Sequence, residues 1–208
     1  MKWLWSKVKR PAQEIQFLGI KWQDGHCQIP TDVINKITAM SPPTNKKETQ
    51  AFLGVVGFWR LHILNYSLIV SPLYYVTRKK NDFKWGPEQQ QAFEQIKQEI
   101  VHAGALGPVW TGPDVKNVLY TAARENGPTG SLWQKAPGET RGQPLGFWSR
   151  GYRGSEANYT PTEKETVAAY EGADLLDDFP WWCFAWAEFR EQGFEKAEEE
   201  AVTALYQV

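Results

Sequence analysis

Residues 42–60, PPTNKKETQAFLGVVGFWR, constrain the fold of this chain more than any other segment. The two prolines predict a turn, because proline lacks a backbone donor and cannot continue a preceding helix. Asn45 and Glu48 stand three positions apart, which is the spacing of a capping pair at a helix N-terminus. The segment therefore predicts a helix that follows this cap and runs to about residue 64.

Glycines interrupt this predicted helix on an aromatic-rich face. Apolar residues recur at helical spacing and predict one buried stripe, formed by Phe52, Val56, Trp59 and Ile63. Gly54 and Gly57 each cost about 1 kcal/mol relative to alanine inside a helix. That cost indicates a compensating close approach, either by a neighbouring element of the same core or by a bound polymer. Composition alone favours the packing contact.

Composition narrows the class of protein. The chain has 208 residues, a formal net charge of -1 and a pI near 6.3, which excludes a uniformly basic nucleic-acid binder but leaves a local basic face open. Cys27 and Cys183 lie far apart and argue for a reducing compartment. The three histidines lack metal-ligand spacing, and no window reaches membrane-spanning length. We expect a soluble intracellular protein without a membrane partner, cytoplasmic, with the nucleus as the alternative.

The segments around the glycine-bearing helix predict an α+β protein. Two short strands are expected at 14–22 and 27–29 around a turn, and a helix at 31–40 follows them. Pro87 stands at the permissive first position of another helix, which ends before Gly104.

A strand meander and a last helix complete the pattern. Three strand-like runs are separated by Gly/Pro-rich turns, at Val115–Thr121, Ser131–Lys135 and Leu145–Ser149. Thr160, Pro161 and Glu163 form a helix-start signature for a helix to about Leu176. After it the chain changes character, with a Trp-rich run and then a Glu-rich run to the end. These tryptophans either cover an unfinished sheet edge or form an apolar patch that promotes association.

Five motifs in this order resemble the C-terminal half of a retroviral reverse transcriptase, as found in the Pol polyproteins of endogenous retroviruses. The resemblance covers about residues 7–173. The motifs are QFLG at 16–19, QAFLGVVGFWR at 50–60, SPL at 71–73, FKWGPEQQQAF at 83–93 and YTPTEKE at 159–165. Each motif alone is weak, and their order and spacing together are specific.

The resemblance implies a division into four segments. They are a palm-end hairpin remnant at 1–30, a small helical thumb at 31–80, a truncated RNase H-like connection with flanking helices at 81–176, and a divergent tail at 177–208. In that family the palm-end hairpin grips the primer strand, and the thumb lies along the minor groove of the template–primer duplex. The partner implied is therefore an RNA or DNA duplex, which we expect this chain to bind weakly.

The residues themselves agree with that assignment. A helix that slides along a duplex needs close backbone approach and cations near phosphates, which Gly54 and Gly57 with Lys46, Lys47 and Arg60 could supply. Alternatively, the two lysines are a solvated face and Arg60 caps the C-terminus of the helix. Phe17 is more often a core residue than a grip residue. The candidate nucleic-acid-binding residues are Phe17, Leu18, Gly19, Lys47, Gln50, Gly54, Gly57 and Arg60.

We expect no catalytic or metal-binding residue in this chain. Polymerisation needs paired aspartates that hold two Mg²⁺ ions, and none of the residues before Phe17 is an aspartate. In the RNase H pattern, Ala122 stands where the first carboxylate ligand would be, and only Glu165 matches the helix position. We therefore expect no cofactor, although the intact family enzyme would use Mg²⁺.

Our interpretation is a fragment of an endogenous-retrovirus RNA-directed DNA polymerase polyprotein that retains duplex binding and lacks both catalytic centres. One alternative is a subunit of an active reverse transcriptase or RNase H, completed in trans by association with other Pol segments. Another is a non-functional relic whose product is unstable.

Overall fold

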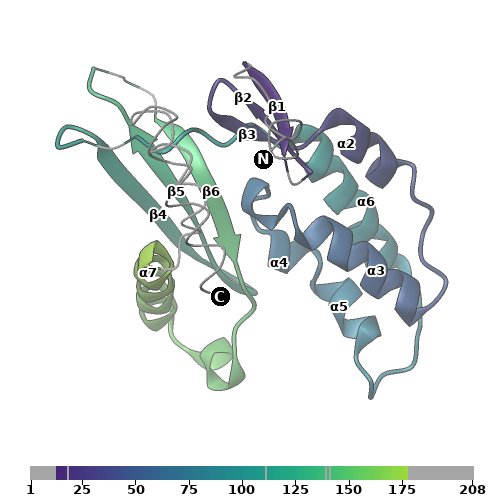
Figure 1. The fold of residues 1–208 in the computed structure, drawn as a ribbon. Helices are drawn as coiled ribbons and strands as arrows, with labels where there is room; N and C mark the ends of the chain where they lie inside the picture. The colour runs from purple at the N-terminus through teal and green to yellow at the C-terminus, as the bar shows by residue number, and fades with distance from the viewer. Residues whose placement is uncertain (1–12, 18, 111, 139, 141, 178–208) are drawn as a thin grey trace, which may run out of the picture.

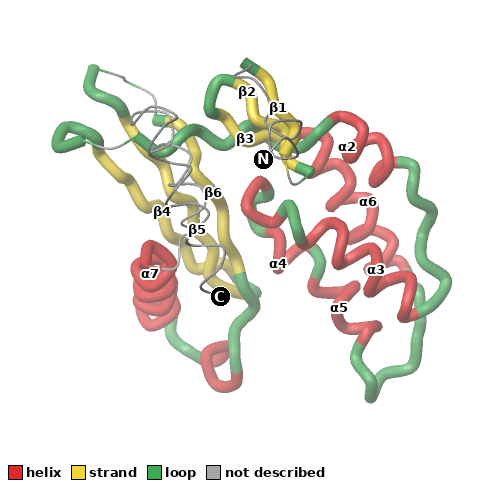
Figure 2. Tube along the Cα trace, in the orientation of Figure 1, coloured by secondary structure: helices red, strands yellow, loops and turns green. Residues whose placement is uncertain are grey.

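The computed structural model describes residues 13–17, 19–110, 112–138, 140 and 142–177. The described residues form two three-stranded antiparallel sheets, and a set of helices comes between them in the order along the chain. In space, the first sheet lies at the top of the view beside these helices, and the second sheet lies on the left (Figures 1 and 2). The first sheet comprises β1 (Glu14–Phe17), β2 (Ile20–Gln23) and β3 (His26–Gln28). The second comprises β4 (Lys116–Arg124), β5 (Gly127–Lys135) and β6 (Gln143–Ser149). The predicted α+β class is confirmed.

The first sheet has one more strand than the sequence predicted. The expected strand at 14–22 is wrong as a single strand, because the chain turns back at Gly19, which has a φ of 78°. Phe17 then pairs with Ile20 across this turn, and Trp22 pairs with Cys27 across the next one. The predicted turn at 23–26 is confirmed, with positive φ angles at Asp24 and Gly25.

The helices between the two sheets share one core with the first sheet. They are α2 (Thr31–Thr38), α3 (Lys46–Gly57), the 3₁₀ turn η1 (Arg60–His62), α4 (Tyr66–Ile69), α5 (Ser71–Thr77) and α6 (Pro87–His102). Phe93, Ile96 and Ile100 of α6 are fully buried in this core. We call β1–β3 together with α2–α6 the helical unit. The division of the chain at residues 80–81 stays a prediction. Helix α6 follows this boundary in the sequence, but it packs into the core formed by the residues before the boundary.

Helix α3 ends earlier than predicted. The expectation of a helix to residue 64 is wrong, because the hydrogen bonds tighten after Gly57: the amides of Trp59 and His62 each bond a carbonyl three residues back, at Val56 and Trp59. Asn65 then adopts a left-handed conformation with a φ of 61°, which ends the turn.

The second sheet carries a helix on one face and meets the helical unit along β6. Helix α7 (Pro161–Asp177) follows the short 3₁₀ helix η2 (Gly154–Asn158) and packs against β4 and β5 (Figure 1). A Cβ on Gly172 of α7 would lie 2.6 Å from Thr121, so the helix approaches the strand too closely for a larger residue. On the other side, the Ser67 amide donates to the Ser149 hydroxyl at 2.9 Å, and the Ser67 hydroxyl donates to the Ser149 carbonyl at 2.7 Å.

None of the described helices is long and apolar enough to cross a membrane. The predictions about Leu18 and about the tail from residue 178 concern residues outside the described part of the chain.

Candidate nucleic-acid interface

The start of α3 is held by a network of hydrogen bonds around its cap. The Asn45 side chain accepts from the Glu48 amide at 2.9 Å, and Glu48 in turn accepts from the Thr44 amide at 2.8 Å and hydroxyl at 2.9 Å. These bonds stabilise the carboxylate, so the pKa of Glu48 is lower than usual. The predicted capping pair is confirmed, and it fixes where the helix begins.

Helix α3 buries one face and leaves the other open. Phe52 and Val56 are buried, as the apolar spacing predicted, and Thr49 and Leu53 are buried with them. The opposite side is exposed and consists of Lys47, Gln50, Ala51, Gly54, Val55 and Phe58. We call these six residues the α3 outer face. Because they follow the helical period from one end of α3 to the other, they form one continuous strip.

The two glycines of α3 differ in what surrounds them. A Cβ on Gly54 would meet nothing within 4 Å, so the protein itself gives no reason for a glycine there. A Cβ on Gly57 would lie 3.1 Å from the Tyr66 hydroxyl oxygen, in a tight intramolecular contact. The packing explanation therefore accounts for Gly57, while Gly54 opens the outer face to a close approach from outside. The role of both residues in binding stays a prediction.

The cations near α3 also separate into two kinds. The Lys46 ammonium donates to the backbone carbonyls of Arg78, at 3.0 Å, and of Asn81. The expectation that Lys46 offers a cation to phosphates is therefore wrong, because its ammonium group is bonded to the loop that follows α5. Lys47 and Arg60 are exposed, and among the described residues neither side chain makes a hydrogen bond or an ion pair. These two cations are available to an anionic ligand.

Phe58 belongs to the outer face, although the sequence reasoning did not single it out. It stands at the C-terminal cap of α3 and is 58% exposed. Its ring packs edge-on against buried Trp59, with the ring centroids 4.8 Å apart. The signal was present in the sequence, because Phe58 follows Gln50 and Gly54 at intervals of four residues.

The hairpin residues lie at the β1–β2 turn. Gly19 is exposed, and Phe17 forms with Ile20 the strand pair that adjoins the turn. Ile20 and Trp22 of β2 are buried in the same core as Phe52 and Leu53 of α3, so the hairpin and α3 are fixed to one body. The structure thus places five of the predicted binding residues, Gly19, Lys47, Gln50, Gly54 and Arg60, on the exposed surface of the helical unit.

Glu165 reaches the strand that carries Ala122. One of its carboxylate oxygens accepts a hydrogen bond from the Ala123 amide at 3.1 Å, so the α7 carboxylate does lie at this point of β4. Ala122 contributes a methyl group and no ligand. In the described part of the chain, no three His, Cys, Asp or Glu side chains gather closely enough to hold a metal ion. The donors present here do not fit a pair of Mg²⁺ ions.

Comparison with known proteins agrees with this geometry. Residues 85–179 match the model of the RNase H-like domain found in reverse transcriptase. The chain is 37% identical over 166 residues to a Gag-Pol polyprotein of feline leukemia virus, an alignment that covers 79% of the chain and 9% of the polyprotein. It is 32% identical over 147 residues to a Gag-Pol polyprotein of baboon endogenous virus (strain M7), covering 70% of the chain and 8% of the polyprotein.

Solved structures share the fold. The foamy viral protease–reverse transcriptase in complex with dsDNA superposes with a TM-score of 0.69 at 26% identity, covering 83% of this chain and 36% of that one. A second foamy viral protease–reverse transcriptase, dRH, in complex with ds DNA gives a TM-score of 0.66 at 27% identity, with 79% and 28% covered.

The fold is therefore that of a viral reverse transcriptase in its RNase H-like portion, joined to a helical unit with one open helix face. The chain itself is a homologue of the Pol polyproteins of retroviruses and endogenous retroviruses, and it resembles the C-terminal part of their reverse transcriptase. It spans about a tenth of the length of these two relatives.

Proposed function

We propose that this chain binds a nucleic-acid duplex weakly and without sequence preference, through the α3 outer face and the β1–β2 turn, and that it performs no catalysis by itself. Two neighbours with the same fold, at 26% and 27% identity, are described in complexes with double-stranded DNA. Their likeness supports a duplex as the ligand class. The α3 outer face supports the place of contact.

The observation that carries the proposal is the open strip around Gly54. After the first turn, where the exposed Glu48 carboxylate stands beside Lys47, the strip carries no charge up to Arg60. Gly54 lets a ligand approach the helix backbone there with no side chain in between. Gln50 can hydrogen-bond to a sugar, and exposed Phe58 can pack on a sugar. Contacts of this kind fit the shape of a groove without reading a sequence.

Lys47 and Arg60 set the expected strength of binding. A protein that neutralises Z phosphates of B-DNA shows a slope of about −0.9 Z in log affinity against log salt, so two contacts give a slope of about −2. Such a small number of phosphate contacts corresponds to weak binding. It also agrees with the net charge of -1.

We propose no catalysis by this chain because of the side chains at β4, where a metal-binding site would need carboxylates. A two-metal reaction needs several carboxylates around the ions. At the strand position where the resemblance places the first ligand, this chain has Ala122, and Glu165 is already bonded to the Ala123 amide. No step through a metal ion is therefore assigned to this site.

A binding experiment with matched variants tests the proposal. Gel-shift titrations of the full chain on a primer–template duplex, at about 50 and 200 mM salt, should show binding that weakens at the higher salt. The double variant Lys47→Glu with Arg60→Glu should abolish most of this binding and its salt dependence. The control Lys36→Glu with Lys164→Glu changes the net charge equally, on α2 and α7, and should bind nearly as well as the parent chain.

Two results would overturn the proposal. The first is no salt-sensitive shift with the parent chain. The second is equal loss of binding in the control and the α3 variant, because net charge alone would then explain the effect.

A further inference from the structure

The face of the second sheet opposite α7 carries a hollow with a volume of about 460 Å³. Its lining residues are Tyr120, Ser131, Trp133, Lys135, Thr140 and Gly142. Tyr120 pairs with Ser131 across β4 and β5, and Leu119 and Thr121 point to α7 instead. Because side chains alternate along a strand, the hollow lies on the face that α7 leaves free. Its volume is in the range of pockets that hold small ligands.

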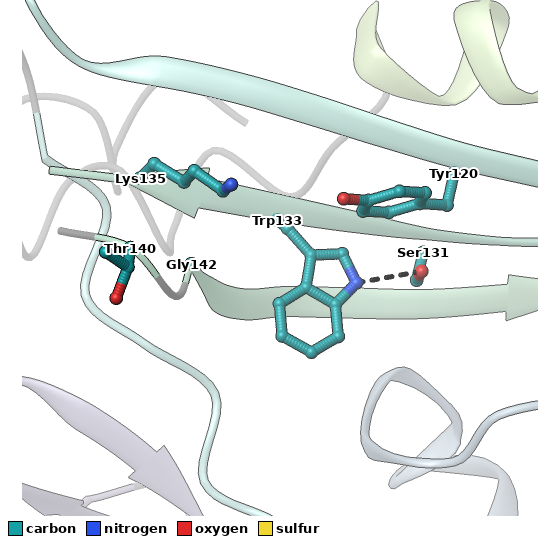
Figure 3. A pocket seen from close by; sticks show the side chains of 6 residues that line it. All are labelled: Tyr120, Ser131, Trp133, Lys135, Thr140 and Gly142. Carbon is teal, nitrogen blue, oxygen red and sulfur yellow. Dashed lines mark hydrogen bonds between the residues drawn. The ribbon is translucent and has the colours of Figure 1, made fainter.

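Two aromatic rings form the apolar part of this hollow. Tyr120 is 55% exposed, although it lies in the middle of β4. Its ring meets the Trp133 ring edge-on, with the centroids 6.5 Å apart and the planes at 89°. Figure 3 shows the Trp133 ring projecting from the sheet between Tyr120 and Lys135. An exposed aromatic face on a rigid strand is the platform on which a nucleobase stacks.

The Trp133 ring is held in place. Its indole N–H donates to the Ser131 hydroxyl oxygen at 2.9 Å, which is drawn as the dashed line in Figure 3. Ser131 itself is only 9% exposed and lies on the central strand β5. The ring orientation is therefore set before a ligand arrives, so less conformational entropy is lost on binding.

Lys135 lines the hollow and gives it a positive charge, and a second lysine, Lys116, lies next to the lining on β4. Lys116 and Lys135 stand directly opposite each other on β4 and β5. Like charges in this position repel each other and destabilise the sheet. Within the described part of the chain, neither ammonium group forms an ion pair or a hydrogen bond that would offset this repulsion. An anionic group placed between them would relieve it, so the charge of the site is complementary to a phosphate.

From this combination we infer that the hollow is a second binding site, for a single-stranded nucleic-acid segment. A base stacks on Trp133 beside Tyr120, and the adjacent phosphate lies between Lys116 and Lys135. The inference goes beyond duplex binding on α3 and does not depend on it, because the hollow belongs to a different sheet and involves none of the α3 residues. A basic peptide would find no acidic side chain among the described lining residues. An acidic peptide could meet the lysines but would carry no base to stack on the aromatic rings.

The test measures binding of a short fluorescent oligonucleotide, oligo(dT) or oligo(U), to the full chain by fluorescence anisotropy. Tyr120→Ala removes the aromatic ring beside the stacked base, and Lys135→Glu reverses one of the two charges at the phosphate. Each variant should weaken binding about fivefold, comparable to the lower end for loss of one stacking contact. Both positions are on the surface of the sheet, and Lys135→Glu replaces a repulsive pair with an attractive one, so both variants should fold. A thermal melt followed by circular dichroism checks this.

Matched controls lie on the other side of the sheet. Tyr170→Ala removes a tyrosine that is 69% exposed on α7, and Lys164→Glu reverses a charge on the same helix. Both controls should bind the oligonucleotide as the parent chain does. The α3 double variant Lys47→Glu with Arg60→Glu should lose duplex binding and keep single-strand binding, which separates failure of one proposal from failure of the other.

Three outcomes would overturn the inference. One is no measurable binding of the single strand by the folded parent chain. Another is unchanged affinity in Tyr120→Ala and Lys135→Glu, which would show that the single strand does not bind in the hollow and would favour a protein as its ligand. The third is a loss with Lys135→Glu alone that Lys164→Glu reproduces, because the attraction would then be general and not located at the hollow.

Discussion

At the scale of single residues, Gly54 and Gly57 show how one residue type serves two purposes on one helix. Gly57 lies against the Tyr66 hydroxyl, so a side chain there would disturb the core of the helical unit. Gly54 faces open space and carries a cost in helix stability that no intramolecular contact explains. This difference makes Gly54 the residue whose replacement separates stability from binding.

We expect Gly54→Ala to stabilise the chain and weaken its duplex binding. Alanine has a higher helix propensity than glycine, so the free energy of unfolding should rise by up to about 1 kcal/mol. The added methyl group would keep a groove wall away from the backbone, and Gly54→Leu should do so more strongly. Urea unfolding and gel shifts on the same samples measure both effects. A variant that is more stable and binds equally well would contradict the role of Gly54 in binding.

At the scale of elements, an arginine joins the end of β6 to α7 through η2. The Arg150 guanidinium donates to Glu156 at 2.6 and 3.1 Å and to Glu171 at 2.6 Å. The side chains of these three residues are between 14% and 22% exposed. The hydrogen bonds from Arg150 lower the pKa of Glu156 to about 2. The cluster therefore holds α7 in place through carboxylates that must stay ionised.

This pKa predicts how stability depends on pH. Because the pKa of Glu156 is lower in the folded chain than in the unfolded one, its contribution is complete above about pH 5 and falls as the pH drops toward 2. Glu156→Gln should lower stability at pH 7 and show a smaller further loss between pH 5 and pH 3. The pKa values of Glu48 and Glu163 are also lowered in the folded chain. The stability of the variant should therefore still fall at low pH, but less than that of the parent chain.

Urea unfolding midpoints at pH 7, 5 and 3 measure this effect. The control Glu125→Gln removes an exposed carboxylate in the β4–β5 turn, and among the described residues that carboxylate has no hydrogen-bond partner. Equal pH dependence in Glu156→Gln and the parent chain would show that the Arg150 cluster does not contribute to acid stability.

At the scale of the whole molecule, α6 connects the helical unit to the chain that builds the second sheet. Its buried residues fill the same core as α3 and α5, and the segment after it pairs Leu106 with Cys27 of β3. The Gly107 amide then donates to the carbonyl of Pro144 in β6 at 2.8 Å. The helix thus completes one core before the chain enters the next sheet.

Fragments of different length test this arrangement. We expect residues 1–107 to melt cooperatively and residues 1–80 to lack a cooperative transition, because the shorter fragment loses fully buried Phe93, Ile96 and Ile100. Each of these side chains contributes about 1.5–3 kcal/mol when buried, which is a large part of the stability of a small unit. Circular dichroism during heating measures the result. A cooperative melt of residues 1–80 would place the boundary where the sequence alone suggested it.

Local signals in the sequence were enough to predict much of this molecule. The cap at Asn45, the buried stripe of α3, the three strands of the second sheet and the start of α7 each depend on residues a few positions apart. The order of the motifs indicated the Pol relatives. Short-range rules suffice here because hydrogen bonds and side-chain periodicity within one element act over the same few residues.

Only the tertiary structure decided which of those residues are free. Lys46 differs from Lys47 because it donates to carbonyls 32 and 35 positions away, and Ser67 bonds to Ser149 across 82 positions. The hollow at Trp133 likewise requires β4, β5 and the loop before β6 to come together. Such contacts depend on how whole elements pack, and packing is a property of the complete core that no short stretch of sequence contains.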